Sequence, residues 1–120
     1  MDIDILENNN GASIAEIAND DVVITTAQDA LDLIMGPGIP FPKKIILQRQ
    51  NIAEAFYDLS SGLAGDVMQK FVTYHAQVAI VGDFSDLSEH FHSLVLERNR
   101  GGDIGFVGTT EEAIDFLSRD

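Results

Sequence analysis

The chain has 120 residues, of which 45% are hydrophobic and 22% charged, values typical of one globular domain with a packed core. Its 20 acidic and 7 basic residues give a formal charge of −13, so we expect neither nucleic acid nor an anionic membrane as a partner. The absence of cysteine excludes disulfides and thiolate metal sites. The start, "MDIDILENNN", resembles no export signal, and we expect a cytoplasmic protein.

The N-terminal segment is predicted to form a β-hairpin. Ile3 and Ile5 alternate with acidic residues, an Asn-rich turn closes on Gly11, and Ile14 and Ile17 belong to a second apolar run. Glycine suits a reversal because it readily adopts a left-handed backbone.

A first helix is predicted in "TAQDALDLIMG", with Thr26 as its N-cap and Asp29 three residues later. Its inward face, at helical spacing, comprises Ala27, Ala30, Leu31 and Ile34. The loop "GPGIPFP" holds all 3 prolines of the chain and must end this helix. The run "KKIILQ", Lys43 to Gln48, is typical of a central strand that is buried on both faces.

The second half alternates helices and strands. A helix from about Ser61 to Tyr74 has an inward stripe of Leu63, Val67, Met68, Phe71 and Val72. The strand "QVAIVGD" follows, and Ser85 can cap a third helix that turns Leu87, Phe91, Leu94 and Val95 inward. The strand "DIGFVG" precedes a last helix, "TTEEAIDFLS", where Thr109 and Glu112 form a capping-box pair.

The order of elements is therefore ββαβαβαβα, which predicts a single α/β domain over residues 1–120. The crossovers require parallel pairing beyond the antiparallel N-terminal hairpin, so the sheet is mixed and mostly parallel. Open α/β sheets bind ligands at the edge where their parallel strands end. Polar side chains and the residues beside them should form a binding edge there, comprising Gln48, Gln50, Asp58, Ser60, Ser61, Gly62, Asp83, Phe84 and Ser85.

Sequence motifs for catalysis or cofactors are missing, which favours a non-enzymatic protein without a cofactor. The chain contains no GxGxxG pattern after a strand, no phosphate loop, no GxSxG elbow and no HExxH pair. His90 and His92 diverge by about 200° on a helix, so they cannot readily share a metal ion. Asp86 and His90 could touch as a solvated pair, and His75 suits the negative end of the second helix.

The stretch "DLSSGLAGD" allows two interpretations. In the first, Asp58 or Ser60 caps the second helix by accepting a bond from an unpaired amide of its first turn. In the second, the same amides hold a phosphate that has been added to Ser60 or Ser61. Both interpretations use the same backbone groups, so the sequence leaves them open.

The segment "KKIILQRQNIAEAFYDLSSGLAGDVMQKFVTYHAQVAIVGD" and the order of elements resemble the sulfate transporter and anti-sigma factor antagonist (STAS) domain. Ser60, Ser61, Gly62 and Leu63 match part of its Asp-Ser-Ser/Thr-Gly-Leu motif. In bacterial regulators of that family a kinase phosphorylates one hydroxyl of this motif, and the resemblance implies Ser60 or Ser61 as the acceptor. "DLSSGLAGDVMQKF" with "AIVGDFS" is also similar to a group of small uncharacterised bacterial proteins, known only as a domain of unknown function.

We therefore expect a STAS-like protein-interaction module, with a protein partner or a second copy of the chain. The alternative is a small-molecule binder or small enzyme that uses Gln48, Gln50, Asp58, Ser60 and Asp83. A cavity of several hundred cubic ångströms at this edge would favour the alternative. Exposed Phe56, Tyr57 or Phe84 would favour a protein partner. A structural dimer without a switch would use both serines as helix caps.

Overall fold

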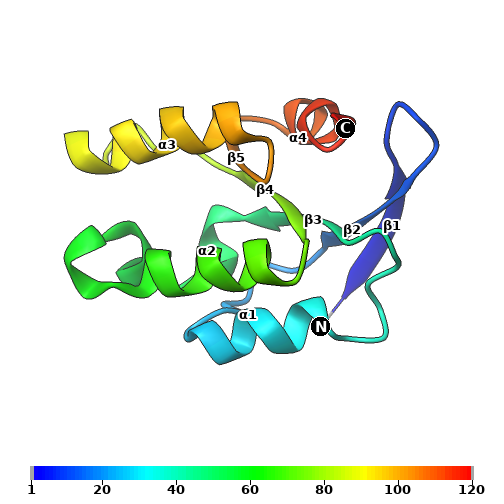
Figure 1. The fold of residues 1–120 in the computed structure, drawn as a ribbon, viewed down its shortest axis with the longest axis horizontal. Coiled ribbons are helices and arrows are strands. Elements are labelled where there is room, and N and C mark those ends of the chain that lie inside the picture. The colour runs from blue at the N-terminus through cyan, green and yellow to red at the C-terminus, as the bar shows by residue number, and fades with distance from the viewer. Residues whose placement is uncertain (1, 120) are drawn as a thin grey trace.

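The computed structural model describes residues 2–119, which form a five-stranded sheet with four α-helices (Figure 1). The strands are β1 (Ile3–Glu7), β2 (Ser13–Ile17), β3 (Lys44–Gln48), β4 (Gln77–Val81) and β5 (Ile104–Val107). The helices are α1 (Ala27–Ile34), α2 (Leu63–Thr73), α3 (Glu89–Gly101) and α4 (Thr110–Phe116). The mixed α/β fold is confirmed. Within residues 2–119 no helix combines the length and apolar character needed to cross a bilayer.

The strands lie in the sheet in the order in which they occur along the chain, β1 to β5. β1 pairs antiparallel with β2, so the predicted N-terminal hairpin is confirmed, and β2 to β5 pair in parallel. All four parallel strands therefore end at one side of the sheet, which we call the carboxyl edge. They begin at the opposite side, which we call the amino edge.

The predicted central strand is β3, and it is buried on both faces of the sheet. Ile45 and Leu47 belong to the larger core cluster, which includes buried residues of α1, α2 and α3. Ile46 points to the other face, where it joins a smaller cluster with Phe116 of α4. Three helices thus cover one face and α4 covers the other. Continuous apolar sequence is needed here because both faces exclude water.

Two inward residues were assigned wrongly from helical spacing. Val72 is 40% exposed near the end of α2. In α1, Leu33 is buried, whereas Leu31 is half-buried. Helices α1 and α2 also pack against each other, a contact that the spacing within one helix does not reveal.

The predicted N-caps of α1 and α3 can be compared with the structure. Thr26 caps α1, and its hydroxyl accepts a bond from the Asp29 amide at 3.2 Å. Ser85 does not cap α3; its amide donates to the Asp83 carboxylate at 2.9 Å within the preceding turn. The cap is Ser88, whose hydroxyl accepts from the Phe91 amide at 3.2 Å. Starting α3 there places Phe91 in its first turn, where it is fully buried.

Helix α2 begins at Leu63 and not at Ser61. Residues Leu59–Ser61 form a separate 3₁₀ turn, and Gly62 follows it in the left-handed region at φ +79°. An L-residue rarely adopts this conformation, so glycine is required where the turn passes into the helix. Ser60 and Ser61 consequently lie before the helix and outside its hydrogen-bonded body.

The outer edge of β5 is covered by a side chain from α3. The Asn99 amide nitrogen donates to the Phe106 carbonyl at 3.1 Å, and the Asn99 side-chain oxygen accepts from the Phe106 amide at 2.7 Å. One asparagine therefore bonds with both backbone groups of Phe106, as a neighbouring strand would.

Candidate functional site

The carboxyl edge is formed mainly by the segment between β3 and α2. Residues 49–61 comprise three short 3₁₀ turns, η1 (Arg49–Asn51), η2 (Glu54–Tyr57) and η3 (Leu59–Ser61). Phe56 and Tyr57 anchor the segment in the core, where the Phe56 ring lies 6.2 Å from that of Phe91. This packing holds a loop without regular helix in one place, so its polar groups have defined positions.

The predicted edge residues do not form one cluster among residues 2–119. Gln50 donates from its side chain to Asp20 at 3.1 Å, beyond the end of β2. Asp83 and Ser85 bond to each other in the turn after β4. Asp58, Ser60 and Ser61 form a third group at the start of α2, and no hydrogen bond of the described residues links it to the other two.

Arg49 connects the loops that follow β3 and β4, and sequence reasoning missed this role. Its guanidinium bonds both carboxylate oxygens of Asp86, at 2.7 and 3.2 Å, and also donates to the Asp83 carbonyl. The same group lies 5.0 Å from the centre of the Tyr57 ring and 5.9 Å from that of Phe84. Such stacking adds a cation–π attraction to the ion pair.

The pKa values at this contact follow from the ion pair. The hydrogen bond from Arg49 holds the pKa of Asp86 below its usual value, and the same bond raises the pKa of Arg49. Asp86 is therefore committed to Arg49, and its expected contact with His90 is not formed among the hydrogen bonds of residues 2–119. The partner that Arg49 selects lies 37 positions away, so local sequence carries no signal for the pair.

Asn51 fixes the other side of the edge. It is fully buried, and its side-chain nitrogen donates to the carbonyls of Asn19 and Asp21 at 2.9 and 2.8 Å. Its side-chain oxygen accepts from the Gln48 amide at 2.7 Å. The side chain therefore satisfies backbone groups of two separate segments, which a buried amide must do to avoid a desolvation penalty.

Asp58 and Ser60 form a compact exposed turn before α2. The Asp58 carboxylate accepts bonds from the Ser60 hydroxyl at 2.6 Å and from the Ser60 amide at 3.0 Å. These two bonds lower the pKa of Asp58, the side-chain bond contributing most. Asp58 thus has the capping role that the sequence indicates, but for the 3₁₀ turn and not for α2.

Ser61 is held more tightly than Ser60. Its hydroxyl oxygen lies 2.5 Å from the Ala55 carbonyl and 2.8 Å from the Asp58 carbonyl, and it accepts from the Leu63 amide at 3.2 Å. Only Ser61 therefore bonds an amide of α2. The cap bonds expected of both serines in a structural dimer are therefore made by Ser61, whereas Ser60 donates its hydroxyl to Asp58.

The aromatic residues of this edge, whose exposure would favour a protein partner, are not exposed. Phe56 and Tyr57 are buried, and Phe84 is half-buried with its ring 5.4 Å from that of Phe106. These three aromatic residues therefore pack in or against the core. Burial also raises the pKa of Tyr57, whose hydroxyl donates to the Arg49 carbonyl at 2.7 Å.

A large cavity beside the serines would favour a small-molecule ligand. Three cavities of about 620, 210 and 340 Å³ are found among the described residues, and none of them is lined by Asp58, Ser60 or Asp83. The cavity of 210 Å³ touches Gln48 and is lined by Asp4, Glu16 and Asp20. Its acidic lining and small size do not match a substrate pocket of several hundred cubic ångströms.

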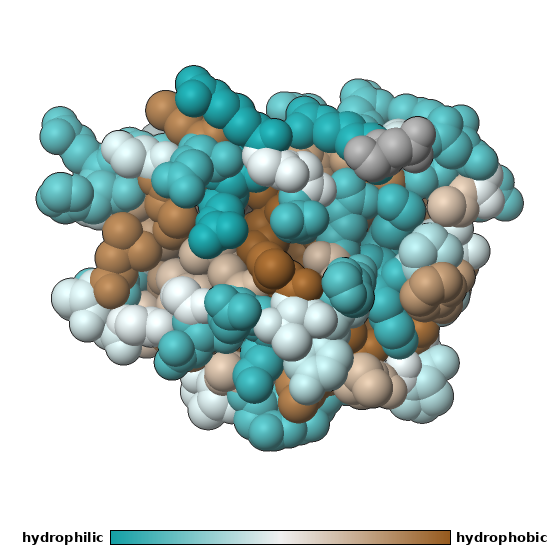
Figure 2. All heavy atoms as spheres, in the orientation of Figure 1, coloured by the Kyte–Doolittle hydropathy of each residue, from teal (hydrophilic) through white to brown (hydrophobic). Residues whose placement is uncertain are grey.

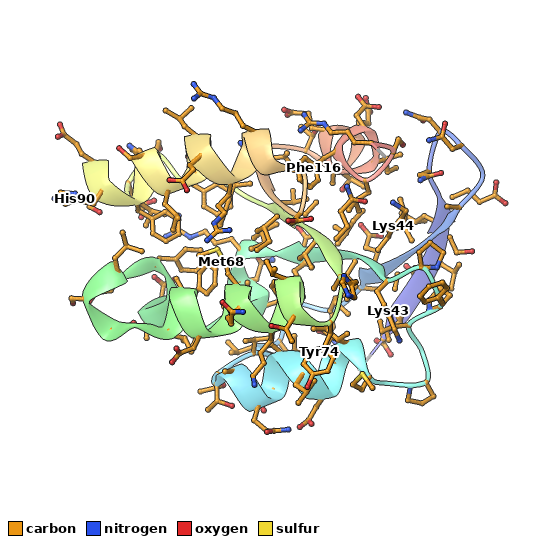
Figure 3. All side chains as sticks on the ribbon, viewed as in Figure 1. Lys43, Lys44, Met68, Tyr74, His90 and Phe116 are labelled. Atoms are coloured by element: carbon orange, nitrogen blue, oxygen red, sulfur yellow. The ribbon has the colours of Figure 1, made fainter. Side chains whose placement is uncertain are left out.

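The three histidines have separate surroundings. His92 has one ring nitrogen 2.8 Å from the Phe84 carbonyl, whereas His90 is exposed at the beginning of α3, at the far left of Figure 3. His75 follows α2 with a left-handed backbone at φ 57°. Within residues 2–119 no group of three or more His, Asp or Glu side chains could hold a metal ion.

A family model described as "Domain of unknown function (DUF4180)" matches residues 9–117, which include every helix and all strands except β1. No curated protein and no solved structure gives a significant match to the chain. The description of the family assigns no activity, so the function must be argued from the site itself.

Proposed function

We propose that this chain, which belongs to the DUF4180 family, is a STAS-like protein-interaction module of the bacterial cytoplasm that is switched by phosphorylation at Ser60. The observation that carries the proposal is the exposed Ser60 hydroxyl and its 2.6 Å bond to the Asp58 carboxylate. Ser61 is the second candidate acceptor. Its hydroxyl is engaged by two carbonyls and one amide, so modification there would first have to break these contacts.

A phosphate on Ser60 would change this turn through charge. It adds nearly two negative charges at neutral pH. The Ser60 hydroxyl would lose the proton that it donates to Asp58, and two anionic groups would then occupy the position of the present hydrogen bond. We expect the Asp58 cap to open as a result. The unpaired amides at the start of α2 offer the phosphate a nearby set of donors.

The turn can transmit this change to a partner because apolar and polar groups are exposed together there. Leu59 is 38% exposed immediately before Ser60. Asp58, Ser60, Ser61 and Gly62 are also exposed, and all belong to one short segment. A partner that contacts Leu59 would therefore also contact the modified serine.

Phosphosite mapping tests the proposal. The purified protein is incubated with ATP and lysate from its source organism, and modified residues are identified by mass spectrometry. We expect phosphate on Ser60 in the wild type and none there in Ser60→Ala. Ser93→Ala is the matched control, because Ser93 is an exposed serine of α3 that lies outside this turn. Its removal should leave the modification unchanged.

A second measurement connects the phosphate with binding. Proteins that co-purify with the tagged wild type are compared with those retained by Ser60→Ala and Ser60→Glu. We expect at least one partner to be retained by one variant and lost by the other. If Ser60 and Ser61 both stay unmodified in stressed and in phosphate-limited cells, and both variants retain the same partners, the switch is wrong. A structural dimer without a switch, or a small-molecule role for this edge, would then be the remaining alternatives.

A further inference from the structure

The largest of the three described cavities lies at the amino edge, opposite the proposed switch. It has a volume of about 620 Å³ and is bounded by the end of α2, the end of α3, the starts of β3 and β4, and the turn after β1. Pockets for small organic ligands usually have volumes of about 300–1,000 Å³. The cavity therefore has room for a ligand, at the side of the sheet opposite the predicted binding edge.

The cavity contains basic side chains in a strongly acidic protein. Lys44 and Arg119 line it together with His75, and Asp103 is the acidic residue of the lining. The chain as a whole has 20 acidic and 7 basic residues, so a randomly placed cavity would have mainly carboxylates. This reversal of local charge favours an anion inside the cavity over one elsewhere on the surface.

Lys44 and Arg119 are held in position by neighbours that leave donors for a ligand. The Lys44 ammonium, with three N–H groups, donates to the Gln77 side-chain oxygen at 2.6 Å. The Arg119 guanidinium donates to the Asn99 carbonyl at 2.8 Å and lies 4.8 Å from the centre of the Phe116 ring. An ammonium and a guanidinium positioned in this way can bind the oxygens of an anion by charge-assisted hydrogen bonds.

Apolar groups form the wall next to these cations. Val72 is 40% exposed near the end of α2, and Pro42 is exposed before β3, so both can contact an apolar ligand surface. Figure 3 shows Lys44 on the side of the molecule where α2 ends, and Figure 2 shows hydrophobic residues between hydrophilic ones in the middle of the same view. The lining thus combines a cationic and an apolar part.

We propose that this cavity binds a small organic anion with an apolar body. The anionic oxygens would bond to Lys44 and Arg119, and the apolar body would pack on Pro42 and Val72. The site is separate from Ser60, so its occupation does not depend on the phosphorylation switch.

The test uses 8-anilinonaphthalene-1-sulfonate, which has a sulfonate on an aromatic body, and follows its fluorescence at low ionic strength. We expect saturable binding to one site of the folded wild type. Lys44→Gln and Arg119→Gln should each weaken binding by about tenfold, the usual effect of losing a charge-assisted hydrogen bond. Asp103→Asn should tighten binding, because it removes the carboxylate of the lining. Lys70→Gln removes the same charge outside the cavity and should leave binding unchanged.

The same titrations can overturn the proposal. It is wrong if the wild type does not bind the probe, if both glutamine variants bind as tightly as the wild type, or if Lys70→Gln weakens binding equally. It is also wrong if the uncharged N-phenyl-1-naphthylamine binds as tightly as the sulfonate. Lys44→Gln alters the bond to Gln77, whereas Arg119 and Asp103 are exposed. The Arg119→Gln and Asp103→Asn variants should therefore fold normally, so a change in their binding reports on the cavity itself.

Discussion

The two edges of the sheet use their polar side chains in opposite ways. At the carboxyl edge, Arg49 and Asn51 bond to neighbouring loops, and these contacts draw the segments after β2, β3 and β4 together. At the amino edge, Lys44 and Arg119 line a cavity of about 620 Å³. The difference shows that a concentration of polar residues after parallel strands need not form a pocket, because these residues can satisfy one another.

The largest expected effect on stability comes from Asn51→Ala, which tests whether internal hydrogen bonds hold the carboxyl edge together. Asn51→Ala removes three side-chain bonds to the backbone and should lower the free energy of unfolding by about 3 kcal/mol, because buried partners are left unsatisfied. Chemical denaturation gives this value. Asn9→Ala is the control: Asn9 is exposed and its side chain bonds to exposed Asp115, so its loss should change stability by less than about 0.5 kcal/mol. Equal effects would show that the buried amide has no special role.

The next largest effect on stability concerns the close contact between Arg49 and Gly82, the residue that directly follows β4. A Cβ at Gly82 would lie 2.7 Å from the Arg49 Cβ, so Gly82→Ala must displace Arg49 and should cost about 2 kcal/mol. Gly65→Ala is the matched control, since its Cβ would meet nothing within 4 Å in α2. That variant should gain about 0.5–1 kcal/mol from the better helix propensity of alanine. Chemical denaturation of both variants measures the contrast, and a neutral Gly82→Ala would mean that Arg49 is free to move.

The smallest expected effect on stability lies at the amino edge, where α2 and α3 are each followed by a residue whose backbone is in the left-handed region. His75 has φ 57° after α2, and Gly102 has φ 83° after α3. Since a side chain disfavours this conformation, His75→Gly should raise the free energy of unfolding by about 1 kcal/mol. Gly102→Ala should lower it by a similar amount, about 1 kcal/mol. Thermal unfolding of both variants measures the pair. A loss of stability in His75→Gly would show that the imidazole makes a contact worth more than the backbone strain.

The sequence predicted the elements well because their signals are local. The continuous apolar run at β3 and the Thr26 cap each depend on neighbouring residues, and both are found. Residues 49–61 could not be predicted in this way, because Phe56 is held by Phe91 and Phe106, which are distant in sequence. The cap of α3 was placed at Ser85 because two serines precede that helix. Burial of Phe91, a tertiary effect, selects Ser88.

The candidate sites differ in the same respect. The grouping of Asp58, Ser60 and Ser61 could be predicted from one short motif, because these hydrogen bonds join residues that are at most six positions apart in the sequence. The cavity at the amino edge could not, because Lys44 and Arg119 are brought together by β3 and by the segment after α4. Only the folded chain places these two cations around one space.

The Asn99 side chain has a consequence for the behaviour of the protein in concentrated solution. A strand at the border of a sheet can recruit a strand from another molecule, which begins fibril growth. Asn99 already occupies both backbone groups of Phe106, in the middle of β5. We therefore expect a single amide on a neighbouring helix to hinder self-association along this border, without a charge or a proline in the strand itself.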